Sequence, residues 1–229
     1  MLCEGEAEAA YLLPSGSNYV FVLVLRFPDV SPGLAVYKPR QGEAPLWDFP
    51  AGTLYRREYA AYLVARAGGW DFVPPTVVRD GPQGVGAVQL FIDHDPRQNI
   101  FTFGAEREAE IRDLAAFDLV ANNADRKAGH CLLDAAGRMW AIDHGLTFHT
   151  DHKLRTVLWD FAGQPVADAS LVRMRRVLEA LKGDDLRSEL GALLHPAEVA
   201  ALRARCERLL EQPTYPQPGG YRPYPWPPV

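Results

Sequence analysis

The most informative stretch reads Asp118-Leu-Val-Ala-Asn-Asn-Ala-Asp125-Arg-Lys-Ala-Gly-His130-Cys-Leu-Leu133, and it continues at Met139-Trp-Ala-Ile-Asp143-His-Gly145. Asp125 lies in a polar loop after a helical apolar pattern, and Asp143 precedes a glycine. The apolar segments between them flank a turn at 134–137, which is typical of a β-hairpin. The stretch therefore predicts two carboxylates at the ends of neighbouring elements, with a hairpin between them.

The residues that precede this stretch carry strand signals. Strands are predicted over residues 19–27, 34–38, 73–78 and 85–92, because these runs are β-branched or aromatic and are bounded by turn residues. One helix is predicted over 54–67, with Thr53 as its N-cap and Gly68 and Gly69 as its stop.

The residues that follow it are mostly helical. Helices are predicted over 106–120, 171–181, 186–194 and 196–210. We therefore predict an α+β fold with a strand-rich N-lobe (1–95) that holds one main helix, a small helical C-lobe (96–212) and an extended Pro/Tyr-rich tail (213–229). We expect the tail to pack its aromatic side chains across the body: Tyr215, Tyr221, Tyr224 and Trp226. Ligands favour clefts between two such lobes.

Composition narrows the class of protein. The 229 residues are 48% hydrophobic and 23% charged, with a formal net charge of −5, which argues against a nucleic-acid partner or a polybasic membrane surface. Three cysteines without paired spacing predict free thiols. The acidic N-terminus differs from a signal peptide, and the longest apolar run is too short for a membrane span. We expect a cytoplasmic protein without integral membrane association; the oligomeric state stays open, with a monomer favoured.

Lys38 and Glu58 form a candidate ion pair. Lys38 ends a predicted strand, and Glu58 shares an apolar helix face, where a carboxylate is costly unless it is paired. Lys38 would satisfy Glu58; the alternative partners are Arg56, Arg57 or Arg66. Before the first strand, the small residues Ser15, Gly16 and Ser17 form a turn whose backbone N–H groups can face phosphate, although most such turns bind nothing.

The two carboxylates suit phosphoryl transfer. Asp125 would orient an acceptor hydroxyl, Arg126 or Lys127 would neutralise phosphate charge, and Asp143 would hold a divalent metal through oxygen. The alternative interpretation of the first site is a plain polar loop that ends a helix. His130, a candidate second metal ligand, either hydrogen-bonds this loop, changes the metal preference or marks a lost metal site. A transition-metal hydrolase site formed by His130, Asp143, His144, His149, Asp151 and His152 is a further alternative.

These motifs, in this order, resemble the phosphatidylinositol 3- and 4-kinase branch of the protein-kinase-like superfamily. They are similar to type II phosphatidylinositol 4-kinases, to HipA-type kinases and to an uncharacterised bacterial phosphatidylinositol-kinase-like family. The matching segments are Ser15-Gly-Ser-Asn-Tyr-Val20, Tyr37-Lys-Pro39, Arg57-Glu-Tyr59, Asn122-Asn-Ala-Asp-Arg126 and Ala141-Ile-Asp-His-Gly-Leu146.

The resemblance implies a two-lobed protein-kinase-like fold that binds ATP with Mg²⁺ or Mn²⁺ and an unidentified phosphoacceptor. It implies that Lys38 binds phosphates, that Glu58 positions Lys38, and that Asp125 is the catalytic base. Adenine would lie against a hinge formed by Gln89, Leu90, Phe91 and Ile92. His130 stands where a kinase has Asn, and His144 where it has Phe. An active kinase acting on a protein Ser/Thr or a small hydroxylated acceptor, a pseudokinase and an AMP-transferring variant therefore stay open.

Overall fold

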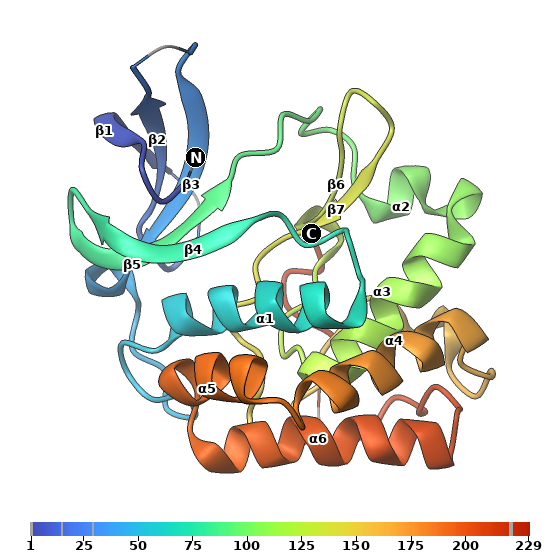
Figure 1. Cartoon of the computed structure of the whole chain (residues 1–229). Helices are drawn as coiled ribbons and strands as arrows, with labels where there is room; N and C mark the ends of the chain where they lie inside the picture. Colours follow the sequence, from blue (N-terminus) through green and yellow to red (C-terminus); the bar gives the residue numbers. More distant parts are fainter. Residues whose placement is uncertain (1, 15, 29, 220–221) are drawn as a thin grey trace.

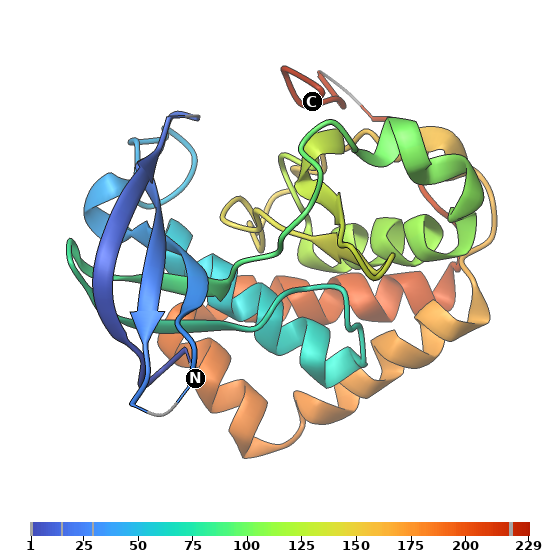
Figure 2. The ribbon, with the colours of Figure 1, turned by 90° about the horizontal axis from the view of Figure 1, so that it is seen from above.

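A sheet and a group of helices lie side by side in the computed structural model, which describes residues 2–14, 16–28, 30–219 and 222–229 (Figures 1 and 2). The strand-rich part comes first in the chain, and the helices follow. The predicted α+β class is therefore confirmed, whereas the exact boundaries at residues 95 and 212 stay predictions. None of the helices in the described ranges is long and apolar enough to cross a membrane.

The sheet is antiparallel and has five strands in the order β1-β2-β3-β5-β4. Its strands are β1 (Glu6–Leu13), β2 (Val20–Arg26), β3 (Gly33–Pro39), β4 (Thr76–Gly81) and β5 (Gly84–Leu90). A separate hairpin joins β6 (Cys131–Leu133) to β7 (Met139–Ala141). Strand β1 was not predicted, because it begins with Glu and Ala, which are uncommon in strands, and because as an edge strand it buries none of its eight residues.

The helices are α1 (Leu54–Gly68), α2 (Ile100–Phe103), α3 (Glu108–Ala121), α4 (Asp168–Ala180), α5 (Asp184–Leu193) and α6 (Pro196–Glu211). Short 3₁₀ turns cover Arg40–Gly42, Gly104–Glu106, Ala128–His130 and Trp159–Phe161. The prediction that the Thr53 side chain caps α1 is wrong, because its hydroxyl donates to the carbonyl of Pro50. Glu43 accepts the N–H of Tyr55 at 2.9 Å instead, so a loop residue satisfies this helix end.

Helix α1 joins the two parts of the molecule. It packs against β4 and β5 on one side and against α4 and α5 on the other, and its apolar residues belong to the largest core cluster. Arg57, only 1% exposed, donates to the carbonyl of Thr147 at 2.6 Å and to Glu198 of α6 at 2.6 Å. The helix that carries Glu58 is therefore held against both the helical part and the loop after β7.

The tail packs differently from the prediction. Tyr215 is buried and donates its hydroxyl to the carbonyl of Arg112 at 2.6 Å, as expected for an anchoring aromatic residue. Tyr224 and Trp226 are 54% and 88% exposed, so their packing was predicted wrongly. Proline carbonyls, which a composition argument cannot place, make the contacts of this part of the chain. Tyr221 lies outside the described residues.

We predict that Arg57→Leu lowers the free energy of unfolding by about 3–5 kcal/mol, because it leaves the Glu198 carboxylate in a buried position without its partner. The matched control is Arg66→Leu on the same helix; Arg66 is exposed, and its loss should change stability by less than about 0.5 kcal/mol. Urea denaturation of both variants measures the difference. Equal stabilities would show that the Arg57 pair does not hold α1 in place.

Candidate active site

Lys38 is the centre of the site. It lies on β3 opposite Ala87 of β5, and its ammonium contacts Glu58 of α1 and the Asp143 Oδ1 atom, the latter at 2.9 Å. The other carboxylate oxygen of Glu58 accepts the backbone N–H of His144 at 3.0 Å. The predicted Lys38–Glu58 pair is therefore present, and the same two residues connect the sheet, α1 and the loop after β7.

Opposite charges stabilise each other in this cluster. Burial alone would lower the pKa of Lys38, but Asp143 and Glu58 outweigh this cost and hold that pKa above its ordinary value. Burial would likewise raise the pKa of Asp143, yet the Lys38 ammonium holds it well below its usual range. Burial raises the pKa of Glu58, and Lys38 opposes this effect. The Asp143 side chain is 46% exposed, so its carboxylate remains open to a ligand.

Asp125 is placed by the end of α3. Asn122 ends the helix in the left-handed region, at φ 53°, and its amide donates to the carbonyls of His149 and Asp151. The Asn123 side chain accepts the N–H of Asp125 at 3.0 Å. The helix end, which the sequence offers as an alternative interpretation, is therefore compatible with the acidic site, because the cap turns the chain so that Asp125 lines the cleft.

Arg126 does not fit the prediction that it contacts phosphate. It is fully buried and donates to both oxygens of Asp118, at 2.8 and 3.0 Å, and to the carbonyl of Ile142 at 2.8 Å. Its guanidinium also contacts the His144 ring at 2.8 Å. Arg126 therefore positions the loops that carry Asp125 and Asp143. Lys127, the other candidate, lines the cleft with its Nζ atom 3.4 Å from Asp125 Oδ2.

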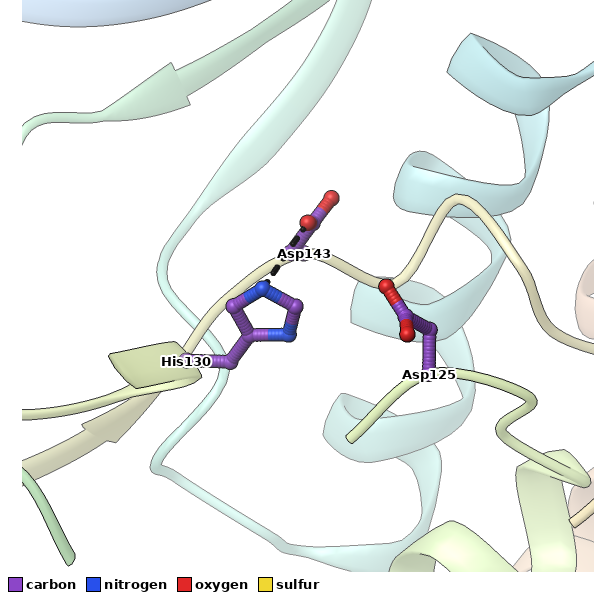
Figure 3. A group of neighbouring side chains, drawn as sticks. All are labelled: Asp125, His130 and Asp143. Atoms are coloured by element: carbon purple, nitrogen blue, oxygen red, sulfur yellow. Dashed lines mark ion pairs between the residues drawn. The ribbon is translucent and has the colours of Figure 1, made fainter. Parts of the chain in front are cut away.

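Three potential metal ligands converge in the cleft (Figure 3). Asp125, His130 and Asp143 each offer an atom, and these atoms lie within 4.8 Å of one another. His130 Nε2 is 3.2 Å from Asp143 Oδ2, and burial lowers the pKa of His130 to about 4, so the imidazole is neutral at pH 7. His130 also accepts the backbone N–H of Lys127 at 3.4 Å, which matches the first of its three predicted roles.

The alternative metallohydrolase cluster is not assembled. Within the described ranges, the group of possible ligands around Asp143 contains neither His144, His149 nor His152. His144 is buried against Arg126, and the His149 ring accepts the N–H of Asp151. The rings of His144 and His149 therefore have partners other than a shared metal site.

The cleft has a volume of about 740 Å³ and lies between the sheet and the 125–146 region. Gly16, at φ 90°, and Ser17 line it before β2, and nothing approaches the position of a Cβ at Gly16 within 4 Å. Ser15 lies outside the described residues. The predicted hinge lines the cleft as well: Gln89, Leu90, Phe91 and Ile92.

The hinge residues already make internal hydrogen bonds. The Gln89 amide donates to Thr76 Oγ1 at 2.8 Å. The N–H groups of Leu90 and Phe91 donate to the carbonyls of Pro75 and Leu34. These groups of the predicted hinge are therefore used within the protein, and the binding of adenine there stays a prediction.

Sequence reasoning missed the residues that support the site. The sequence patterns above give Asp118 no role, although a buried carboxylate on an apolar helix face needs a partner, as for Glu58. The same test would have linked Asp118 to Arg126. The contacts made by Asn123, His144 and the segment 227–229 could not be inferred, because they depend on loops that meet only in the folded chain.

Comparison with known proteins supports the family and the fold. Protein Rv2133c of Mycobacterium tuberculosis (strain ATCC 25618 / H37Rv) is 39% identical over 266 aligned positions, which cover 99% of this chain and 94% of the relative. The chain belongs to the family of this protein. The search against protein-family models found no match.

The solved structures that are similar have kinase-like folds. The proinflammatory kinase CtkA of Helicobacter pylori superposes with a TM-score of 0.54 and 12% identity, covering 90% of this chain and 93% of the other. Hydra Fam20, solved with sugar, gives a TM-score of 0.52 and 14% identity, covering 91% and 86%. The chain therefore has a protein-kinase-like fold.

Asp125 should make stability depend on pH. Burial raises its pKa to about 6 from the ordinary 3.8, so between these values the folded protein binds more protons than the unfolded one. The free energy of unfolding therefore falls as the pH rises through this window. We predict that, in the presence of a metal chelator, Asp125→Asn gains about 1–2 kcal/mol over the parent between pH 4 and pH 8.

The control for this measurement is Asp160→Asn, at an exposed position. Denaturant titrations at both pH values compare the three proteins. If Asp125→Asn and Asp160→Asn follow the same pH dependence, the Asp125 carboxylate is not buried at a cost.

Proposed function

We propose that this chain is an ATP- and divalent-metal-dependent phosphotransferase that acts on a protein Ser/Thr or a small hydroxylated acceptor. The observation that carries the proposal is the convergence of Lys38, Asp125 and Asp143 on one cleft, with Glu58 holding the lysine. Phosphoryl transfer depends on charged groups positioned around a triphosphate. Here an ammonium can bind phosphate oxygens, and two carboxylates can bind a metal ion and an acceptor hydroxyl. The finer resemblance to the phosphatidylinositol 3- and 4-kinase branch and to HipA-type kinases remains a prediction.

Each residue has a role that follows from its position. Lys38 is available to bind phosphate oxygens, since its ammonium faces the cleft and Glu58 fixes its direction. Asp125 can accept a proton from an acceptor hydroxyl, and its pKa of about 6 leaves it ionised at pH 7. Lys127 can neutralise charge on the phosphoryl group beside Asp125.

The residues present fit a divalent cation. Two carboxylates and a neutral imidazole form a donor set that Mn²⁺ accepts readily and Mg²⁺ accepts through its oxygens. Asp143 and Asp125 would hold the ion, and His130 lies beside them. A cation bound here neutralises charge on the ATP phosphates. A pseudokinase is the second candidate function. It is supported by the His130 imidazole, which contacts Asp143 and stands where the resemblance implies an Asn side chain.

We predict that ATP with Mn²⁺ or Mg²⁺ raises the melting temperature of the chain and that Asp143→Ala abolishes the metal-dependent part of this shift. Asp125→Asn should retain nucleotide binding but lose at least about 100-fold in the rate of phosphoryl transfer, because the acceptor hydroxyl loses its base. Thermal shift and a radioactive γ-phosphate transfer assay measure the two effects.

Asp151→Ala provides the control, since Asp151 is exposed and lies outside the cleft. Mass spectrometry distinguishes a transferred phosphoryl group from AMP. Turnover by Asp125→Asn at the parent rate would remove Asp125 from the proposal. Metal-independent ATP binding without transfer to any acceptor would favour the pseudokinase.

A further inference from the structure

Residues 223–229, which we name the strap, run across one side of the active-site cleft. Three hydrogen bonds hold them. The carbonyl of Pro228 accepts the N–H of Ala128 at 2.8 Å, and the carbonyl of Pro223 accepts the N–H of Thr156 and the indole N–H of Trp159, both at 3.1 Å. The strap is red in Figure 2 and lies beside the helical part of the molecule.

The strap reaches the side of the cleft where an acceptor must bind. Pro227 and Val229 line the same cleft as Asp125 and Lys127. A Cβ at Gly129 would lie 3.9 Å from Val229, which is ordinary van der Waals distance. The strap therefore lies on the segment 127–130, next to the proposed base, whereas the hinge and Gly16 line the nucleotide side.

The surface under the strap binds main-chain carbonyl groups. Its donors are two main-chain N–H groups and one indole N–H, and they bind two carbonyls, those of Pro223 and Pro228, in a proline-rich segment that bends at residues 224, 226 and 227. The strap's large side chains at 224 and 226 are exposed and contribute little. Donors at two separate places fit the main chain of a polypeptide, whereas a small polyol or a lipid headgroup would not reach all of them.

We propose that this surface binds the acceptor, that the acceptor is a segment of a protein bound through its main chain, and that the strap occupies the surface until the acceptor displaces it. The inference rests on the proposed function. Displacement is cheap, because in the strap only Pro225 is buried and the contacts are few. The apparent KM for the acceptor is then the intrinsic value divided by the fraction of molecules in which the strap is released.

The experiment compares the full chain with a variant that lacks residues 223–229. Its first arm measures binding of the synthetic peptide Arg-Pro-Tyr-Pro-Trp-Pro-Pro-Val, the sequence of residues 222–229, by calorimetry. We expect saturable binding to the shortened variant, weaker binding to the full chain, and no competition with a non-hydrolysable ATP analogue. In the shortened variant, Trp159→Phe should weaken peptide binding about fivefold, because one hydrogen-bond donor is lost.

The second arm measures phosphoryl transfer to casein, to glycerol and to phosphatidylinositol vesicles. Removal of the strap should lower the KM for casein about tenfold and leave the KM for ATP unchanged. In the full chain, Pro225→Gly changes the buried residue of the strap and leaves the surface intact, so it should lower the KM for casein in the same direction, which separates the loss of strap contacts from damage caused by truncation.

The outcomes distinguish a failure of this inference from a failure of the proposed function. Absence of peptide binding, or competition between peptide and ATP analogue, in a variant that still turns over ATP overturns this inference alone. Transfer to glycerol or to phosphatidylinositol in preference to casein also overturns this inference alone. Peptide binding without transfer to any acceptor overturns the acceptor assignment together with the proposed function.

Discussion

The Lys38 ammonium, placed between Glu58 and Asp143, is the interaction on which the site depends. Each of the three residues comes from a different element: strand β3, helix α1 and the loop after β7. Without the lysine, two carboxylates would lie close together at the edge of a buried region, and their repulsion and desolvation would favour protonation of one of them. The pair of acids is therefore stable as a charged site only while a cation lies between them.

A second buried ion pair fixes the loops that carry residues of the Lys38 cluster. Asp118 and Arg126 are almost completely buried, and Arg126 also holds the carbonyl of Ile142 and the ring of His144. The residues on either side of Arg126 and of His144 are thereby fixed, and they include Asp125 and Asp143. A buried pair of this kind contributes little net stability compared with apolar packing. Its contribution here is structural: it holds the loop that carries Asp125 at a fixed distance from the loop that carries Asp143.

Sequence reasoning succeeded where a local pattern carried the information. The strand ending in Lys38, the helix bearing Glu58 and the hairpin before Asp143 all follow from apolar periodicity and turn residues, and the cost of a carboxylate on an apolar face identified the Lys38–Glu58 pair. It failed where the partner is distant in the chain. Glu43 as the acceptor at the start of α1, Arg126 turned into the core and the proline carbonyls of residues 223–229 depend on contacts that no local pattern encodes. Edge strand β1 was missed because its Glu and Ala residues carry little strand signal and none of its residues is buried.

The most direct test of this account is a crystal structure of the chain with a non-hydrolysable ATP analogue and Mn²⁺, with the metal located by anomalous scattering. The account predicts a triphosphate against Lys38 and an anomalous peak beside the carboxylate of Asp143, with Asp125 facing the terminal phosphate. A nucleotide bound elsewhere, or a cleft in which Lys38 and Asp143 remain paired while saturating analogue and metal leave no density between them, would contradict it.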